Sequence, residues 1–464
     1  MDHFSYEKLV GIRHYITRGI EGIGGAIKTT ISDFIVQEIT ENKDIVTTLD
    51  DRSEELESNR KPSRNGRKYT KFVLKKFGVD TIYAIEYIAK LLGIPSANFE
   101  FAGIKDNRAI TAQEVTIQGD YWDQLASISK DLPKFEIKSI DYSSESLKTG
   151  QLWGNNFIIT IRDIQLEKKE CEQRIMDILG DLVEKGGFLN YFGLQRFGTH
   201  RPNSQKIGKE ILAGNYEGAV NQLLIPHFPE ETPDAIKARE VYEETRDPRK
   251  TLEILPPSLY YETIILEYLA DHPMDFKGAL LALPPQIISI YVYSYQSFIF
   301  NEMISKRMEV LGTGLTSPEI GDMVALLDQK HGLMTKVRYV VKEGNKESLE
   351  DYIKLGKASI VIPIPGSRIK INNDNPNKAI HDEIIVNEQI DKKYYQEREG
   401  SIFHELHGII RPLALFPRNC KVIDVFDDDL NMGKTAARIS FSLSKGTYAT
   451  MFLRELMKIK PKNS

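Results

Sequence analysis

Short segments rich in β-branched and aromatic residues alternate with amphipathic segments along this chain, and this alternation most limits the folds open to it. Partly buried strands are enriched in such residues, whereas helices repeat apolar residues every three or four positions. The predicted strands span 34–39, 114–117 and 157–161, and the predicted helices span 80–92, 171–182, 207–212, 234–244 and 295–308. We therefore predict a mixed α/β (α+β) fold.

The segment 80–92 carries the clearest helix signal. Asp80 has the side chain of an N-cap, and Gly93 is typical of a helix end. One apolar stripe between them is formed by Ile82, Ile85, Ile88, Ala89 and Leu92.

The composition describes a large globular chain with few cysteines. Its 464 residues can bury a sizeable core without covalent staples. Two cysteines, Cys171 and Cys420, exclude a disulfide framework and a cysteine-only metal site. No secretory signal is found at the N-terminus, and the stretch nearest to a membrane span, 279–300, is broken at 284–286. We expect a cytoplasmic protein.

The region from 200 to 410 differs in composition from the rest of the chain. It holds most of the prolines and a polar turn at 372–376. We predict that it is a separate unit inserted between two parts of one core. The predicted core parts are 1–198 and 411–464, and the predicted insertion is 199–410.

Charge is segregated although the net charge is only −5. Five acids lie in 50–57, and eight bases without an acid lie in 60–76. Such a pattern is typical of a solvated loop with compensating charges. It is also typical of a strip that binds the phosphates of a nucleic acid.

Common nucleotide and metal motifs fail in this sequence. The segment 22–29 lacks the glycine that precedes the lysine of a P-loop, and 433–435 has Asp428 where the loop needs its first glycine. Nucleotide hydrolysis is therefore poorly supported. The three acids 427–429 are more typical of an exposed turn than of a metal site.

One polar turn has the chemistry of an active site. An apolar segment leads into Gly103 and is followed by Lys105, Asp106 and Arg108, before a new strand begins. Basic neighbours favour the ionised form of a carboxylate, which can then act as a nucleophile or a base. A Lys-Asp turn alone is commonplace.

A second unusual segment, 187–198, combines aromatic residues, glycines and Arg196. It could form an aromatic corner of the core with a hydrogen-bonded arginine. Alternatively, its rings could be a platform for a base or ribose.

Together these segments resemble the TruD family of tRNA pseudouridine synthases. The matching residues are Lys28, Phe34 and Val36, Gly103–Asp106 with Thr111 and Gln113, Gly154–Phe157, Asn190–Gly198, Tyr295–Asn301 and Ala437–Thr450. The resemblance runs in order over nearly the whole chain. It implies a pseudouridine-synthase catalytic core, with a mixed, mainly antiparallel sheet flanked by helices, and an inserted α/β TRUD domain. The insertion is longer than in the compact bacterial members and is more like archaeal or eukaryotic ones.

The resemblance implies an isomerisation that uses no cofactor and no metal. The C1′–N1 bond of a uridine breaks, the uracil rotates, and C5 joins C1′. Asp106 matches the essential aspartate, which either adds to C1′ or removes a proton from C2′; the sequence leaves both routes open. The expected substrate is uridine 13 in the D-arm of tRNA.

Other roles follow from the same resemblance, residue by residue. Lys28 would face Asp106 and keep it charged, although it could be a surface lysine. Phe34 would lie at the target nucleotide, although it could be a core residue. The remaining substrate-binding candidates are Asn155, Phe157, Tyr448, Lys105 and Arg196. At position 448 many relatives carry phenylalanine, so this chain adds a hydroxyl.

A stacked uridine must be turned out of the tRNA at a cost of about a few kcal/mol, which phosphate contacts can offset. The candidates for these contacts are Arg64, Arg67, Lys68 and Lys71, with Lys458, Lys460 and Lys462 as lesser ones. We expect a monomer whose partner is tRNA.

Two other functions remain as alternatives. A non-catalytic RNA-binding protein or chaperone on the same fold would not need an ionised carboxylate facing a polyanion. A methyltransferase would need a glycine-rich nucleotide loop after its first strand, and the sequence offers no convincing one.

Overall fold

The computed structural model describes residues 3–48, 61–129, 132–312, 314–328, 332–396, 401–403 and 405–459. The chain divides into two compact units. The sheet unit comprises 19–181 and 416–458, and the helical unit comprises 1–18, 182–415 and 459–464. The predicted division at 198 and 410 stays a prediction.

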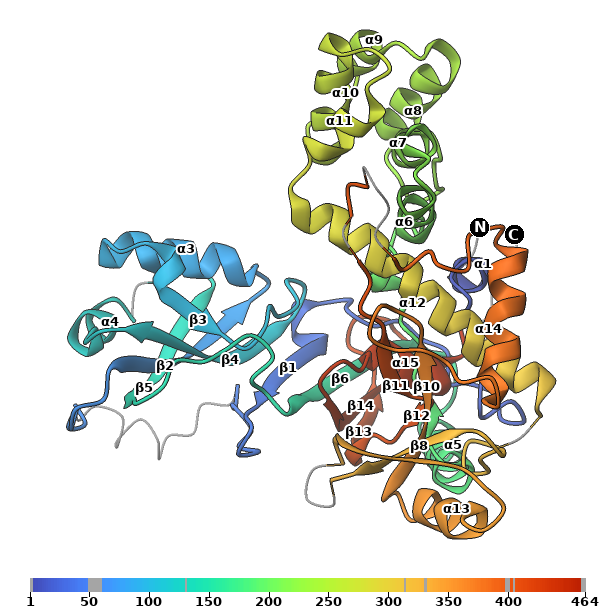
Figure 1. Ribbon diagram of the computed structural model, residues 1–464. Helices are drawn as coiled ribbons and strands as arrows, with labels where there is room; N and C mark the ends of the chain where they lie inside the picture. The colour runs from blue at the N-terminus through green and yellow to red at the C-terminus, as the bar shows by residue number, and fades with distance from the viewer. Residues whose placement is uncertain are drawn as a thin grey trace. The chain divides into compact units, whose positions relative to one another are not determined.

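Within the described part of the chain, the sheet unit is built on a sheet of eight strands (Figure 1). Their order is β13-β14-β6-β1-β4-β2-β5, and β3 pairs with β4. The strands are β1 Phe34–Ile39, β2 Tyr69–Phe77, β3 Phe99–Phe101, β4 Ile110–Gln118, β5 Phe135–Ser143, β6 Gly154–Ile164, β13 Arg418–Asp427 and β14 Thr435–Ser444. Among the described strands of this sheet, β1 and β4 are parallel, and the other pairs are antiparallel. The predicted mixed, mainly antiparallel sheet is therefore confirmed.

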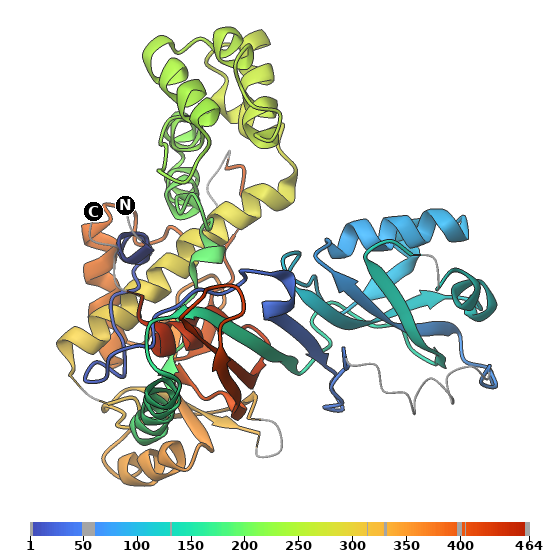
Figure 2. The same ribbon diagram turned by 180° about the vertical axis from the view of Figure 1, so that it is seen from behind.

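Helices cover this sheet, as the view from behind also shows (Figure 2). They are α3 Thr81–Leu92, α4 Trp122–Ile128 and α15 Ala449–Met457, and α5 Lys168–Lys185 continues into the helical unit. A cluster of buried apolar side chains joins α3 and α4 to β2, β4 and β5. Burial of such surfaces is the main force that holds the layers together.

Helix α3 begins and ends where the sequence predicts. Asp80 Oδ1 accepts hydrogen bonds from the backbone N–H groups of Ile82 (2.7 Å) and Tyr83 (3.3 Å). Gly93 ends the helix in the left-handed conformation, with φ of 67°. The predicted apolar stripe included one residue too many, because Ile82 is 40% exposed.

A glycine allows β6 and β14 to approach each other closely. A Cβ atom at Gly154 would lie 2.0 Å from the backbone oxygen of Leu443 in β14. No other residue fits there without moving one strand, which explains the glycine that opens the Gly154–Phe157 motif.

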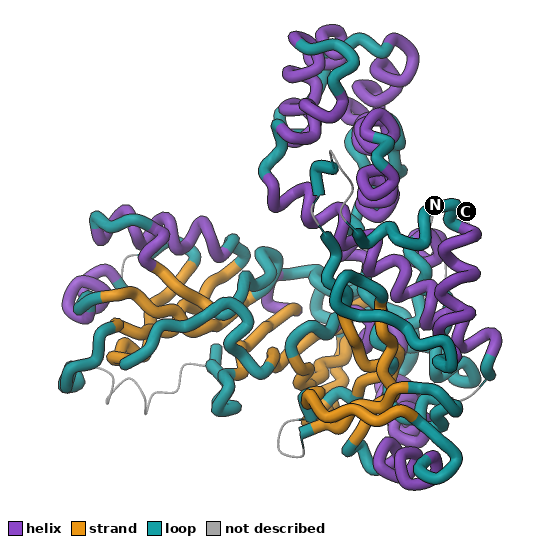
Figure 3. The backbone as a smooth tube through the Cα atoms, in the orientation of Figure 1, coloured by secondary structure: helices purple, strands orange, loops and turns teal. Residues whose placement is uncertain are grey.

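The helical unit combines many helices with a small sheet (Figure 3). Its helices are α1 His3–Leu9, α6 Ser204–Ala213, α7 Tyr216–Leu224, α8 Pro233–Thr245, α9 Pro248–Leu252, α10 Tyr260–Asp271, α11 Phe276–Leu281, α12 Pro285–Val310, α13 Lys346–Lys354 and α14 Pro376–Asn387. Its strands are β8 Met323–Leu327, β9 Met334–Val340, β10 Ala358–Ile364 and β11 Ile409–Pro412, with the short pair β7 Phe188–Leu189 and β12 Ala414–Leu415.

The long helix α12 organises the helical unit through its polar residues as well as its apolar ones. Asn301 is fully buried, accepts a hydrogen bond from the N–H of Phe192 (2.8 Å), and donates to the backbone oxygens of Val10 and Phe192. Asn301, the last residue of the Tyr295–Asn301 motif, therefore links α12 to the segments around Val10 and Phe192.

Candidate active site

Lys28 and Asp106 form an ion pair, although 78 positions separate them in the sequence. Lys28 Nζ donates a hydrogen bond to Asp106 Oδ2. Lys28 precedes β1, and Asp106 lies in the loop between β3 and β4. Because β1 and β4 are parallel, their N-terminal ends lie at the same edge of the sheet, and this arrangement brings the two residues together.

The Asp106 carboxylate is kept ionised in a half-buried place. Burial raises the pKa of the Asp106 carboxyl, but several groups outweigh it and hold that pKa below its usual range. They are the hydrogen bond from Lys28, the backbone N–H of Arg108 at 2.9 Å from Oδ1, and the charges of Lys28 and Lys76. The side chain of Asp106 keeps 32% of its surface exposed, so a substrate can reach it.

Lys28 is held over an aromatic ring by a strained backbone. Its φ of 58° lies in the left-handed region, which a side chain rarely adopts outside special sites. Its Nζ lies 4.4 Å from the centroid of the Phe34 ring, a cation–π contact. The lysine thus contacts both the carboxylate and the first residue of β1.

The predicted positive neighbours of Asp106 need correction. Lys105 directs its ammonium to Glu38 Oε2 (2.8 Å) and to Asn155 Oδ1 (2.9 Å), and it is 6% exposed. Arg108 contributes its backbone N–H. The direction of the Asp106 shift agrees with the prediction, but the charges that cause it belong to Lys28 and Lys76.

The strand register places several candidate residues on one face of β1 and β6. Val36 lies opposite Phe157, and Glu38 lies opposite Asn155. Alternate residues of a strand share a face, so Phe34 lies on the same face. Glu38 was missed by the sequence analysis, and its only sequence signal is this alternation within 34–39.

The rings of Phe34 and Phe157 are packed into the sheet unit. Their centroids are 6.2 Å apart in an edge-to-face arrangement, and Phe157 stacks on Phe441 at 5.3 Å. Phe34 is 4% exposed and Phe157 is 7% exposed. Tyr448 is partly exposed and occupies the N-cap of α15.

Arg196 lies in the helical unit, and its Nε donates to Ser297 Oγ (3.2 Å). The neighbouring rings of Tyr191, Phe192 and Phe197 are buried. Of the two alternatives for 187–198, these rings fit the aromatic corner of the core.

The basic strip 60–76 is not a uniform row of exposed charges. Lys75 and Lys76 are buried, which corrects the prediction that this part of the strip is free for phosphates. Other bases pair with acids: Lys61 with Asp123 at 2.5 Å, Arg67 with Asp141 at 3.3 Å, and Lys71 with Glu114 at 2.8 Å. Arg64 and Lys68 are exposed. Arg60, the acidic run 50–57, Lys460 and Lys462 lie outside the described residues.

The acidic run 427–429 differs from the predicted exposed turn at its middle residue. Asp428 is 5% exposed and accepts from Arg162 Nη1 (2.8 Å), while Arg162 Nε donates to Asp33 (2.8 Å). Burial raises the pKa of Asp428, but hydrogen bonds from two backbone N–H groups, Asn431 and Arg162 hold it well below its usual range. Asp33 also accepts from the N–H of Thr30 (2.7 Å), so this cluster anchors the segment that leads from Lys28 into β1.

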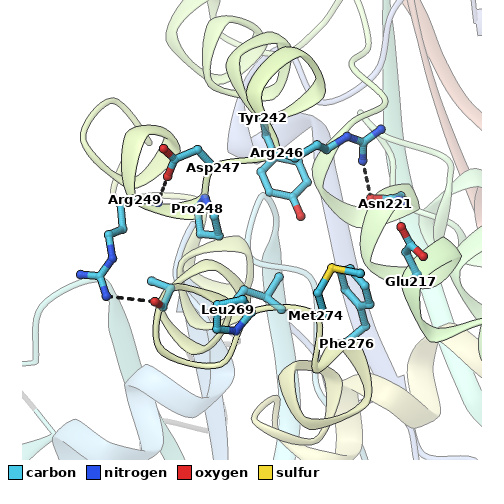
Figure 4. Close-up of a pocket in the computed structure, with 12 residues that line it drawn as sticks. Glu217, Asn221, Tyr242, Arg246, Asp247, Pro248, Arg249, Leu269, Met274 and Phe276 are labelled. Atoms are coloured by element: carbon cyan, nitrogen blue, oxygen red, sulfur yellow. Dashed lines mark hydrogen bonds between the residues drawn. The ribbon is translucent and has the colours of Figure 1, made fainter.

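A separate cavity of about 520 Å³ lies among the helices α7 to α11 of the helical unit (Figure 4). Its arginines already have partners: Arg246 donates to Asn221 (2.7 Å), and Arg249 donates to Asp271 (3.0 Å). The carboxylates of Glu217 and Asp247 also line it. A polyanion would therefore meet acids and paired guanidinium groups, and none of the site residues lies there.

Within the described ranges, no group of three or more His, Cys, Asp or Glu side chains could hold a metal ion. Among the same residues, no helix combines the length and the apolar character needed to cross a membrane.

Comparisons with known proteins agree on one family. A family model described as "tRNA pseudouridine synthase D (TruD)" matches residues 9–456. "Probable tRNA pseudouridine synthase D" of Methanosarcina acetivorans is 33% identical, over 98% of this chain and 97% of the relative. The protein of the same name from Thermococcus sibiricus is 33% identical, over 94% of this chain and 96% of the relative. The crystal structure of the putative tRNA pseudouridine synthase D from Methanosarcina mazei is 29% identical, with a TM-score of 0.79 and 99% of both chains covered.

Proposed function

The chain belongs to the tRNA pseudouridine synthase D (TruD) family, and on that premise we propose that it converts one uridine of tRNA to pseudouridine with Asp106 as the catalytic carboxylate. The observation that carries this proposal is the Lys28–Asp106 ion pair at a partly exposed position. An enzyme that rearranges a nucleoside needs a charged group that can reach the sugar.

The rearrangement moves a glycosidic bond from N1 to C5 of the same uracil. The C1′–N1 bond breaks, the uracil turns, C5 bonds to C1′, and the proton that leaves C5 is replaced by one at N1. An ionised Asp106 can start this sequence by adding to C1′ or by removing a proton from C2′. Both routes need an ionised carboxylate, the form that Lys28 favours.

Asn155 and the rings near Lys28 are proposed to hold the uracil. The amide of Asn155 can donate and accept hydrogen bonds, as the edge of uracil requires. Its Oδ1 already accepts from Lys105, so its NH₂ group is the part we assign to the substrate. Phe34, Phe157 and Tyr448 are the proposed ring contacts, and the hydroxyl of Tyr448 adds a possible hydrogen bond.

The proposed target is uridine 13 in the D-arm, an assignment that rests on the family resemblance. Turning this base out of its stack costs about a few kcal/mol, which contacts with the phosphates can offset. Arg64 and Lys68 are the best candidates in the basic strip, because both are exposed.

The test is a reaction with unmodified tRNA and no added cofactor, followed by carbodiimide modification and primer extension to locate pseudouridine. We expect product at uridine 13 with the wild-type chain. Asp106→Asn should abolish turnover and leave tRNA binding largely intact. Product at no uridine would reject the synthase proposal and leave the non-catalytic RNA-binding alternative. Loss of binding in Asp106→Asn would give Asp106 a structural role.

A further inference from the structure

A fully buried lysine lies behind the loop that carries Asp106. Lys76, in the second-last position of β2, is 0% exposed. Its Nζ donates to three backbone oxygens, those of Asp106 (2.7 Å), Val79 (2.8 Å) and Lys105 (3.3 Å). Two of these acceptors are consecutive residues of the loop, and the third lies in the turn between β2 and α3.

Two further buried side chains hold the same loop by its backbone. The N–H of Lys105 donates to Thr81 Oγ1 (3.2 Å), which in turn donates to Gln113 Oε1 (3.3 Å). Gln113 Nε2 donates to the backbone oxygen of Gly103 (3.0 Å). Thr81 and Gln113 are both 0% exposed. The loop is thus fixed from below, and the Asp106 side chain remains on its partly exposed side.

We propose that Lys76 is a positioning residue for the reaction. Its ammonium binds the carbonyl oxygens of Lys105 and Asp106, which lie on either side of the Asp106 Cα atom. These contacts fix the direction in which the carboxylate projects from the loop. This inference rests on the proposed role of Asp106. Such precision matters because a displacement of about 1 Å at a reacting group can cost about 100-fold in rate.

The charge of Lys76 has a second effect. Burial lowers the pKa of Lys76 to about 8, while Asp80 and Asp106 favour its charged form and Lys105 opposes it. The same ammonium is one of the charges that lower the pKa of Asp106. Loss of its proton would remove both a hydrogen-bond donor and a charge, because two remaining N–H groups cannot serve three acceptors.

The neighbouring Lys75 provides a matched control. It lies in the same strand and is 6% exposed, but its Nζ pairs with Glu136 of β5 at 3.4 Å. Replacement of either lysine by methionine removes one buried ammonium and keeps an unbranched chain. Lys76→Met removes contacts with the Asp106 loop, whereas Lys75→Met removes an ion pair with β5.

The experiment measures single-turnover rates on unmodified tRNA, tRNA affinity and thermal unfolding for the wild type, Lys76→Met, Lys75→Met and Asp106→Asn. Rates are followed from about pH 3 to pH 10, because a carboxyl whose pKa lies below its usual range of about 4 gives its acid limb only below that pH. For Lys76→Met we expect a rate about 10-fold to 100-fold lower, an affinity within about threefold, and an acid limb moved to higher pH. Lys75→Met should keep the wild-type profile.

An unchanged rate and acid limb in Lys76→Met would overturn the inference, as would the same loss in Lys75→Met. Full activity of Asp106→Asn would instead reject the proposed function itself. Should Lys76→Met not fold, Lys76→Gln, which keeps a polar donor but removes the charge and shortens the side chain, provides the deciding measurement. A wild-type rate and acid limb in that variant would contradict the role of Lys76.

Discussion

At the scale of single residues, the carboxylate of Asp106 depends on a charge that arrives from a distant part of the chain. Lys28 adopts a left-handed backbone and reaches both Asp106 and the ring of Phe34. Strain of this kind is kept where the surrounding structure fixes a residue in one position. Asp33, held by Arg162 and bonded to the N–H of Thr30, is part of that surrounding structure.

Lys28→Met should therefore damage catalysis more than binding. The substitution removes the hydrogen bond and the nearest charge that lower the pKa of Asp106, so the acid limb of the rate profile should move to higher pH. We expect at least about a 10-fold loss of rate at neutral pH, because the carboxylate also loses the group that fixes its position. Single-turnover rates measured against pH test this, and an unshifted acid limb would show that Lys28 does not control the carboxylate.

Asp428 offers a prediction on stability. Its pKa is below the usual range when folded, so its contribution is present above the unfolded value of about 4 and is lost as the pH falls through the folded one. Asp428→Asn should cost about 1–3 kcal/mol at pH 7, because Arg162 loses a buried partner. The difference from the wild type should shrink in acid. Urea unfolding at several pH values measures it, with the exposed neighbour change Asp427→Asn as the control.

At the scale of elements, strands and helices with a regular apolar pattern were predictable from the sequence. Strands β1, β4 and β6 and helices α3, α5, α6, α8 and α12 all occupy or include their predicted segments. Strand β2 was missed because its lysines were read as surface charge. The alternation of Thr70, Phe72, Leu74 and Lys76 on its buried face was the available signal.

The site was only partly predictable for a related physical reason. Asp106 could be identified because the charged residues around it lie in one short turn of the sequence. Lys28 was identified from the family resemblance. The partners Glu38 and Lys76 depend on which strands become neighbours, and sheet order is a long-range property that no local pattern contains.

The close contact of β6 and β14 gives a prediction at this scale. Gly154→Ala should destabilise the chain by about 1–3 kcal/mol, since the new methyl group would overlap the backbone oxygen of Leu443. Gly180→Ala is the matched control: it lies within α5 with no atom close to its Cβ position. That change should stabilise by about 0.5–1 kcal/mol. Thermal unfolding of both variants checks the pair, and equal effects would contradict the contact.

At the scale of the whole molecule, a chain with a net charge of −5 must bind a polyanion through a local surface. Arg64 and Lys68 remain exposed, whereas Arg67 and Lys71 are paired with acids. Each phosphate contact contributes about 0.7–0.9 to the slope of log affinity against log salt.

Replacing Arg64 and Lys68 together by glutamine should therefore lower tRNA affinity and reduce the salt slope by about 1–2. Lys90→Gln, at an exposed position of α3, should change neither quantity. Binding isotherms at several salt concentrations provide the measurement. A salt slope equal to that of the wild type would instead favour the alternative that the strip is a solvated loop.

The order of strands also has a consequence for biosynthesis. β6 lies between β1 and β14, and β14 is made after the long segment 182–415 of the helical unit. A nascent chain that ends before residue 416 already contains Lys28 and Asp106, yet it lacks the strand that covers β6 and the ring of Phe441 that stacks on Phe157. The central strand of the site then has an open edge. The ribosome must therefore have made β14 before the sheet around this site can close.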